Sequence, residues 1–234
     1  MPVYLLNEKI VFPPPQFARK DGLLAVGGDL SQDRLLLAYR MGIFPWFTDS
    51  EPILWWSPDP RLVLYPSEFK PSRSLQKKVR QNIFRTTADQ AFSQVITACA
   101  RTRRDKNEGT WIGADMIRAY CRLHASGFAH SVECWHEDQL AGGVYGVSLG
   151  RCFFGESMFT RIRDASKVAL AALVGLLGMN SFDFIDCQIS TPHLIGLGAR
   201  EIPRTLFLEQ LAKALESPTI TGPWSIGMEL TDAD

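Results

Sequence analysis

The strongest constraint on the fold is a group of three consecutive strand-like segments. They read HSVECW (130–135), QLAGGVYGVSLG (139–150) and RCFFGESMF (151–159), and only short connections separate them. Runs rich in β-branched and aromatic residues with tight turns between them predict neighbouring antiparallel strands. Because such a meander is stable only when at least one face is covered, the other segments must supply that cover.

Two helices are expected before this meander. The first would begin after Asp89 as its cap, and its apolar stripe recurs at helical spacing at Phe92, Val95, Ile96 and Cys99. The second is expected near 113–126 and would end at Gly127.

Helix, strand and helix are expected after the meander. Ser166 would open an apolar helix, KVALAALVGLLG (167–178). FDFIDCQI (182–189) reads as a buried strand, TLFLEQLAKAL (205–215) as an amphipathic helix, and the tail beyond it as poorly ordered. This order predicts an α+β domain with a mixed, mainly antiparallel sheet.

The first 75 residues differ in character from the rest. They contain FPPP (12–15), FPWF (44–47) and ILWWSPDPRLVLYP (53–66), which are dense in proline and tryptophan. One short helix is expected over 32–41, between Ser31 and Gly42. We therefore expect a small, irregular α/β domain over residues 1–75 and a larger domain over 76–234.

Charge and cysteine usage exclude several classes of protein. The 25 basic residues cancel the 25 acidic ones, and the five cysteines are scattered without a CxxC pair. Neither a disulfide framework nor a metal site is predicted, and reduced thiols are typical of a cytoplasmic protein. The N-terminus does not resemble a signal peptide, and no apolar run approaches the roughly 18 residues of a membrane span. We expect a cytoplasmic monomer without membrane contact.

Two carboxylates lie in segments that otherwise look like core strands. Strand alternation would place Glu156 on one face with Phe154 and Met158. It would likewise place Asp186 with Phe184 and Gln188, opposite Ile185 and Cys187. A buried carboxylate without a partner costs several kcal/mol, so each must be paired, hydrogen-bonded or functional.

Both interpretations of the carboxylates remain open from local sequence. They would be structural if they paired with arginines such as Arg161, Arg163 or Arg200. Two of them on neighbouring strands, with Gln188 one pleat beyond Asp186, favour a site instead. Cys187 and His193 are close in sequence, but Cys187 should face away from Asp186, which disfavours thiol chemistry.

Three further features each have a structural and a functional interpretation. HLIGLGAR (193–200) is similar to the pyrophosphate-binding loop of CoA-dependent acetyltransferases, but a tight turn ending a short helix fits it better. Trp111 is either core or a platform for a ligand ring. Two basic runs, 70–80 and 101–106, are either solvated faces or one phosphate-binding patch.

Longer motifs then connect the chain to a known family. The chain contains GIFPWF (42–47), WWSPDPR (55–61), GTWI (109–112), FGESMF (154–159) and DCQ (186–188), followed by HLIGLGA. In this order they resemble bacterial leucyl/phenylalanyl-tRNA–protein transferases, and the resemblance extends from residue 22 to residue 204. Thr160 and the LIGLGA run depart slightly from the family pattern without touching the carboxylates.

The resemblance implies a fold and a reaction. It implies a C-terminal acetyltransferase-like domain in which the 3′ end of tRNA replaces acetyl-CoA, with no cofactor. The enzyme would move Leu or Phe, less well Met, from aminoacyl-tRNA to the α-amine of proteins that begin with Arg or Lys. The product would carry an N-end-rule degradation signal. The rival hypotheses are a CoA-dependent N-acetyltransferase and a non-catalytic tRNA-binding module.

The resemblance also implies roles for residues. Asp186 would orient Gln188, which contacts the attacking amine, and Asp186 is the simpler proton acceptor because a neutral amide is a very poor base. Glu156 would hold the aminoacyl-adenosine end and help to neutralise the basic first residue of the acceptor.

Substrate and tRNA contacts complete the expected site. Trp111 would stack on the terminal adenine. The remaining substrate-binding residues are expected to be Phe153, Gly155, Met158, Val144, Leu170, Ile185 and Tyr120. The tRNA-binding residues are expected to be Lys77, Lys78, Arg80, Arg101, Arg103 and Arg104.

Overall fold

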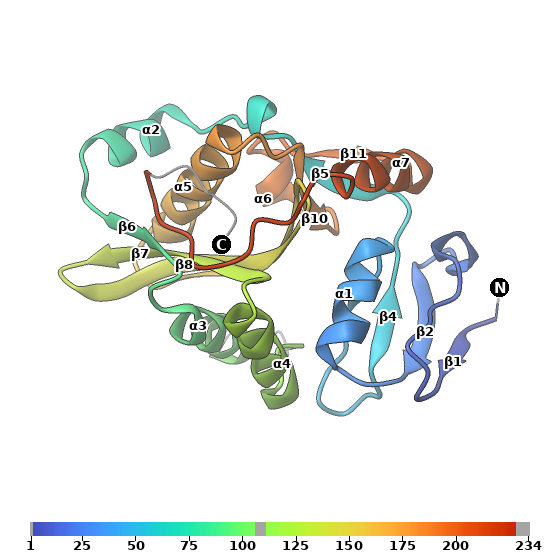
Figure 1. The fold of residues 1–234 in the computed structure, drawn as a ribbon. Helices are drawn as coiled ribbons and strands as arrows, with labels where there is room; N and C mark the ends of the chain where they lie inside the picture. Colours follow the sequence, from blue (N-terminus) through green and yellow to red (C-terminus); the bar gives the residue numbers. More distant parts are fainter. Residues whose placement is uncertain (1, 106–110, 228–234) are drawn as a thin grey trace.

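The computed structural model describes residues 2–105 and 111–227, and its strands form two sheets (Figure 1). The small sheet has the order β1-β2-β4-β3, with β1 (Tyr4–Leu6), β2 (Leu23–Gly27), β3 (Phe44–Pro45) and β4 (Leu54–Trp56). A 3-10 turn (Pro15–Phe17) precedes β2, and helix α1 (Gln32–Arg40) connects β2 to β3, where a helix is expected from the sequence.

The large sheet has seven strands in the order β11-β5-β10-β9-β8-β7-β6. They are β5 (Arg61–Leu64), β6 (Arg85–Ala88), β7 (Ala129–His136), β8 (Gln139–Leu149), β9 (Cys152–Thr160), β10 (Phe184–Gln188) and β11 (Arg200–Ile202). The predicted meander is confirmed as β7, β8 and β9. Within the described part of this sheet, β9 and β10 are the one parallel pair. The α+β class with a mixed, mainly antiparallel sheet is therefore confirmed.

Helices cover both faces of this sheet (Figure 1). Helices α3 (Phe92–Asp105) and α4 (Ala114–Ala125) lie on one face, and α5 (Ala165–Met179) and α2 (Arg73–Arg80) lie on the other. Two separate apolar clusters result, and the one beneath α3 and α4 continues into the small sheet. The remaining elements are a 3-10 turn (Pro66–Glu68), α6 (Pro192–Ile195) and α7 (Arg204–Ala214).

The two sheets separate earlier than the expected domain boundary. The small sheet ends at Trp56 in β4, and β5 already belongs to the large sheet from Arg61. The division at residue 75 itself stays a prediction.

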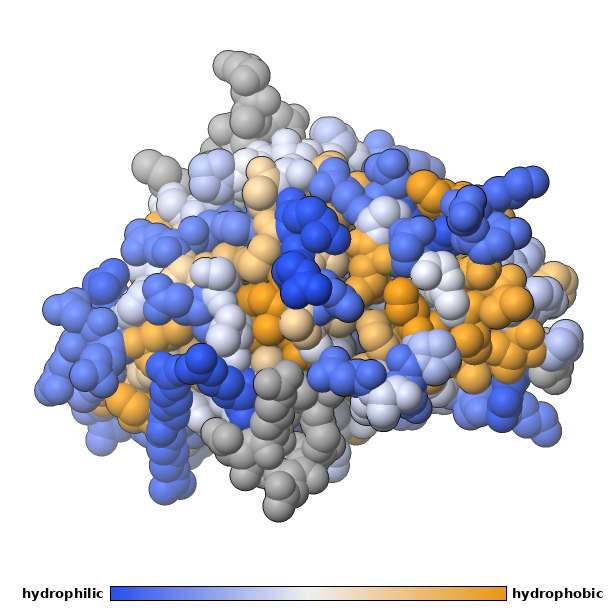
Figure 2. All heavy atoms as spheres, turned by 90° about the horizontal axis from the view of Figure 1, so that it is seen from below, coloured by the Kyte–Doolittle hydropathy of each residue, from blue (hydrophilic) through white to orange (hydrophobic). Residues whose placement is uncertain are grey.

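On the side where the small sheet lies, hydrophobic side chains reach the surface (Figure 2). Residues before Trp46 include four large apolar side chains that are exposed, Leu5, Ile10, Val11 and Phe17.

Two local expectations were wrong. Asp89 has a left-handed backbone (φ 56°) and does not cap α3. Its carboxylate instead accepts hydrogen bonds from the backbone N–H groups of Ser131 (2.9 Å) and Trp224 (2.7 Å). The tail is also better ordered than expected in its described part, where Trp224 is 2% exposed and stacks on His130 at 3.8 Å, whereas residues 228–234 lie outside the described residues. Long-range packing, which local patterns do not encode, decides both positions.

Among the described residues, no helix has the length and apolarity needed to cross a membrane.

Candidate active site

A bulge in β9 positions Glu156. Tyr145 of β8 lies opposite Ser157, whereas the next residue, Gly146, lies opposite Gly155, so Glu156 is an extra residue in the ladder. Such a bulge resets the alternation of side chains. Phe154 packs in the cluster beneath α3 and α4, and Glu156 lies on the same face, where it accepts from Tyr39 and Tyr120, but Met158 packs on the opposite face. The prediction that all three share a face is therefore wrong for Met158.

A second bulge, in β10, positions Gln188. Asp186 lies opposite Val63 and Gln188 lies opposite its neighbour Leu62, so Cys187 is the extra residue. Gln188 adopts a left-handed backbone (φ 63°), and its N–H donates to Asp186 Oδ1 at 2.9 Å. A non-glycine residue in this conformation costs about 1–3 kcal/mol, and such strain concentrates at functional sites. The bulges lie just beyond the parallel β9–β10 pairing, which ends at Asp186 and Phe154.

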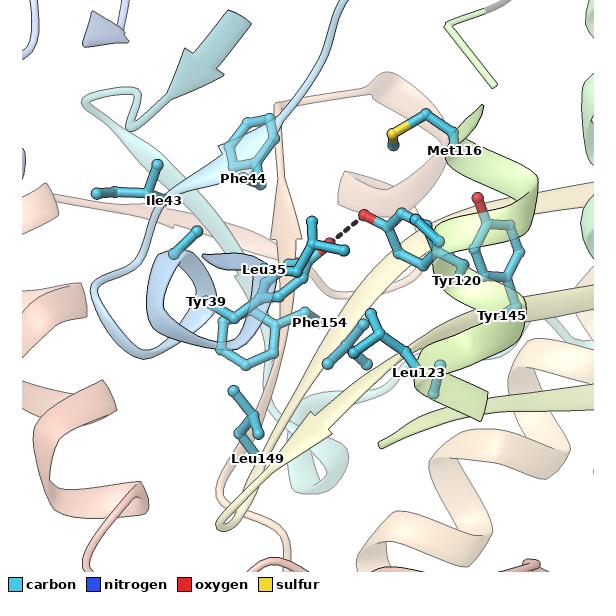
Figure 3. Packing of buried hydrophobic residues seen from close by; sticks show 14 of the residues in the cluster. Leu35, Tyr39, Ile43, Phe44, Met116, Tyr120, Leu123, Tyr145, Leu149 and Phe154 are labelled. Carbon is cyan, nitrogen blue, oxygen red and sulfur yellow. Dashed lines mark hydrogen bonds between the residues drawn. The ribbon is translucent and has the colours of Figure 1, made fainter. Parts of the chain in front are cut away.

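The two bulges bring Glu156 and Gln188 into contact. Gln188 Nε2 donates to Glu156 Oε1 at 2.7 Å. Tyr39 of α1 donates to the same oxygen at 2.8 Å, and Tyr120 of α4 donates to Oε2 at 3.0 Å. The two phenol hydroxyls also contact each other (Figure 3). The Glu156 carboxylate thus accepts hydrogen bonds from α1, which belongs to the small N-terminal part of the chain, and from α4 and β10 of the larger part.

Burial decides the ionisation of this network. Burial raises the pKa of Glu156 to about 7, although the hydrogen bonds from Tyr39, Tyr120 and Gln188 oppose the shift. Burial and the neighbouring Glu156 charge raise the pKa of both phenols, so they stay protonated and act as donors. Glu156 therefore exchanges a proton near neutral pH while its donors do not.

Asp186 has a different environment. Arg61 of β5 donates to its two carboxylate oxygens at 2.8 and 2.7 Å, and both side chains are fully buried. The guanidinium lies between the rings of Phe44 (4.8 Å) and Phe207 (4.5 Å). An arginine does pair with Asp186, but it is none of the three considered from sequence. The only sequence signal for Arg61 was an arginine opening the apolar run RLVL.

The three arginines considered from sequence have other partners. Arg161 donates to the Leu140 carbonyl oxygen at 3.1 Å, and Arg200 pairs with Glu68 at 3.0 Å. Arg163 lies 3.9 Å from Asp164 and is 93% exposed. In the part of the chain that the structure describes, Glu156 pairs with no arginine and is satisfied by two phenols and an amide.

A cavity of about 410 Å³ opens beside Glu156 and Gln188. Its walls are mainly apolar and come from β3, β8, β9, α5 and the end of β10. Of the expected substrate-binding residues, the structure places in these walls Trp111, Val144, Gly155, Met158, Leu170 and Ile185. Wall residues outside the expected set are Phe44, Pro45, Trp46, Ser157, Leu173, Cys187, Ile189, Thr191, His193 and Leu194.

Two expected substrate-binding residues lie outside the walls of this cavity. Phe153 is buried, and its ring lies 5.9 Å from that of Trp224. Tyr120 is also buried and lies behind Glu156, so it contacts the carboxylate rather than the cavity. The strand register decides where Phe153 lies, and this register could not be read from the sequence. A volume of 410 Å³ is typical of small-ligand sites.

The described residues of the two basic runs lie on different helices. Lys77 and Arg80 are exposed on α2, whereas Lys78 pairs with Asp164 at 2.6 Å. Arg101 lines a second cavity, of about 340 Å³, beside α3. The side chains of Arg103 and Arg104 lie outside the described residues. Helices α2 and α3 cover opposite faces of the sheet (Figure 1), so Lys77 and Arg80 lie on another face than Arg101, and the rest of the expected tRNA contact stays a prediction.

Two alternative chemistries find no support. HLIGLGAR forms the short helix α6 and a turn at Gly198 (φ 106°), where a Cβ atom would lie 2.3 Å from the Glu68 carbonyl oxygen. Strand β11 follows, not the helix start that a pyrophosphate loop requires. Burial raises the pKa of the Cys187 thiol, which keeps it from being a thiolate nucleophile.

Comparison with known proteins gives consistent matches. The family model described as leucyl/phenylalanyl-tRNA protein transferase matches residues 63–212, and the model of that transferase's N-terminal domain matches residues 28–59. The chain is similar to the leucyl/phenylalanyl-tRNA–protein transferase of Desulfatibacillum aliphaticivorans, at 60% identity over 98% of each chain. It is 61% identical to that of Syntrophobacter fumaroxidans over 91% of each chain.

One solved structure is more distantly similar. It is the C-terminal domain of a putative lysylphosphatidylglycerol synthetase from Agrobacterium fabrum, which matches 74% of this chain and 56% of its own. The identity is 9% and the TM-score 0.42, which is too low to support a conclusion about fold or function.

Proposed function

Because this chain belongs to the leucyl/phenylalanyl-tRNA protein transferase family, we propose that the cavity beside Glu156 holds the aminoacyl end of tRNA. The family makes the protein an aminoacyl-tRNA protein transferase, with an aminoacyl-tRNA and an acceptor protein as substrates. The finer proposal is transfer of Leu or Phe, less well Met, to the α-amine of proteins that begin with Arg or Lys. A cytoplasmic monomer that creates N-end-rule degradation signals fits this reaction.

The apolar part of the cavity suits the transferred side chain. Val144, Met158, Leu170 and Ile185 line it and present no charged group. Such a wall selects by size and shape, at about 1–3 kcal/mol per methylene. Trp46 and Trp111 line the same cavity and offer aromatic faces for the terminal adenine.

The contact between Glu156 and Gln188 orients the amide. An ionised carboxylate only accepts hydrogen bonds, so Gln188 must present Nε2 to it. Gln188 Oε1 then points away from Glu156 and is available to accept an N–H from the attacking amine. In the proposed role, Asp186 positions Gln188 by accepting its backbone N–H while Arg61 holds the carboxylate.

Glu156 is the best-supported proton acceptor. Its pKa of about 7 leaves about half of it ionised at pH 7, so it can accept the proton that the amine nitrogen loses on attack. Asp186 is held by Arg61 and does not line the cavity, which favours Glu156 over the earlier assignment. A carboxylate has about four lone-pair sites, and three donors leave one for the amine or a bridging water.

The reaction balances without a cofactor. The neutral amine attacks the ester carbonyl carbon, a C–N bond forms, and the C–O bond to the ribose breaks. Glu156 takes the proton lost by nitrogen and returns it to the departing ribose oxygen. Positioning supplies most of the acceleration, because an aminoacyl ester is already activated.

The observation that carries this proposal is the buried Glu156–Gln188 contact at the mouth of an apolar cavity. The test is to incubate the protein with Phe-tRNA and a peptide that begins with Arg. We expect peptide extended by Phe, sensitivity to ribonuclease, and no effect of CoA. Acetylation of the peptide by acetyl-CoA would support the acetyltransferase, and tRNA binding without extension would support the non-catalytic module.

A further inference from the structure

The acceptor's basic first side chain needs a carboxylate that the site described so far does not supply. Glu156 already accepts hydrogen bonds from two phenols and an amide and is 7% exposed, so it is poorly placed to bind the cationic side chain of the acceptor as well. We propose that Glu201 in β11 binds the Arg or Lys side chain of the acceptor and sets the preference for a basic first residue. This inference rests on the proposed function.

Strand register places Glu201 near the reacting amine. Leu62 of β5 lies opposite Gln188 on one side and opposite Glu201 on the other. The two residues therefore occupy one row of the sheet, two strand spacings or about 9.5 Å apart. An extended arginine or lysine side chain whose α-amine lies at Gln188 can bridge that separation.

A second contact ties Glu201 to the cavity rim. Ser190 Oγ donates to Glu201 Oε1, and the neighbours of Ser190, Ile189 and Thr191, both line the cavity. Glu201 is exposed, and among residues 2–105 and 111–227 it has no ion-pair partner within 4.0 Å. The carboxylate is thus fixed in direction and keeps an oxygen for a ligand.

The surface between the two positions suits the stem of such a side chain. Ile189 lines the cavity and is 40% exposed. Arginine and lysine pack their methylene stems on apolar surface while the charged head reaches a polar partner. Burial and then the charge of Lys167 lower the pKa of His193 on the same rim, so this imidazole is neutral at pH 7 and does not repel a cation. Lys167 itself pairs with Asp164 at 3.2 Å.

The test compares two peptides that differ only in charge. One begins with arginine and the other with citrulline, which has nearly the same shape without the charge. We expect the wild-type protein to prefer arginine in kcat/KM by about 10- to 150-fold, the range for hydrogen bonds to charged groups. In Glu201→Gln the ratio should fall to about one, through a loss of kcat/KM on the arginine peptide. The matched control is Glu209→Gln, an exposed carboxylate on α7, which should keep the wild-type ratio.

The outcomes separate two failures. An undiminished preference for arginine in Glu201→Gln overturns the assignment of Glu201, whereas absence of transfer to either peptide by the wild-type protein overturns the proposed function. If Glu201→Gln also loses transfer to the citrulline peptide, Glu201→Lys decides. A preference for a glutamate-starting peptide over citrulline then supports the assignment, and a retained preference for arginine rejects it.

Discussion

The ionisation of Glu156 can be tested by removing one of its donors. Tyr120→Phe deletes the hydroxyl that donates to Oε2 at 3.0 Å and keeps the ring that packs edge-on against Tyr145 at 5.8 Å. A hydrogen bond to a charged group contributes about 1.5–3 kcal/mol. Since one pKa unit corresponds to about 1.36 kcal/mol, the loss should raise the pKa of Glu156 by about one to two units.

The direction of the change follows from which form the bond favours. The phenol stabilises the carboxylate, so its removal favours the protonated acid and moves the pKa of Glu156 upward from about 7. At pH 7 the ionised fraction should fall from about one half to about 1–10%. Transfer should therefore drop by about 5- to 50-fold at pH 7 and recover near pH 9–10.

The assay is single-turnover transfer from Phe-tRNA to an Arg-starting peptide between pH 6 and 9.5. The peptide amine titrates identically with both proteins, so the ratio of variant rate to wild-type rate isolates the enzyme's own group. Infrared spectroscopy supplies a readout without activity, because the protonated-carboxyl band absent in Glu156→Gln should persist to higher pH in Tyr120→Phe. Tyr65→Phe, which removes a hydroxyl bonded to Gln210 instead, is the control.

A rate ratio that stays constant across this pH range would refute the reasoning. It would mean that the phenol affects transfer without changing the ionisation of Glu156. An infrared band that does not move would exclude the pKa shift directly, whatever the rates did.

Four further outcomes are expected. The free energy of unfolding of Glu156→Gln should rise relative to that of the wild type by about 3 kcal/mol as the pH increases from 4.5 to 7. Over this range the wild-type protein loses stability, because its folded state, with a pKa of about 7 at Glu156, holds a proton that the unfolded chain has released. Gly155→Ala should fold normally, since the new Cβ meets Ile185 at 3.6 Å, but should lose transfer of Phe by about 10-fold or more. Asp186→Ala should cost about 3–5 kcal/mol in urea denaturation, because it leaves the charge of Arg61 buried and unpaired. Lys77→Glu should reduce the salt dependence of tRNA binding by about one unit of slope if it meets a phosphate.

Each of these outcomes has a companion variant or a limit that would contradict it. Glu133→Gln should change stability with pH in the same direction as Glu156→Gln, since burial also raises the pKa of Glu133. Gly146→Ala should destabilise where Gly155→Ala does not, because its Cβ would lie 2.1 Å from the Phe154 carbonyl oxygen. Lys213→Glu, on α7, should leave the salt slope unchanged. A stability loss for Asp186→Ala below about 1 kcal/mol would contradict the buried ion pair.

The sequence alone determined the main elements around the meander and singled out the two carboxylates. The meander over 130–159 and the apolar stripe that includes Phe92 and Val95 are local patterns, set by strand and helix periodicity, and both are confirmed. Glu156 and Asp186 stood out because carboxylates rarely occur in apolar strands without a partner or a role.

Only the tertiary structure decided what these carboxylates contact. The bulges at Glu156 and Cys187 reset the alternation, because adding one residue to a strand turns all later side chains to the other face. The partners Arg61 and Tyr39 lie 125 and 117 residues away in sequence from Asp186 and Glu156. No local pattern encodes such distant contacts, since they depend on how separately formed elements pack together. The proposal that Glu156 accepts the proton therefore depends on its burial and its donors, which only the tertiary structure supplied.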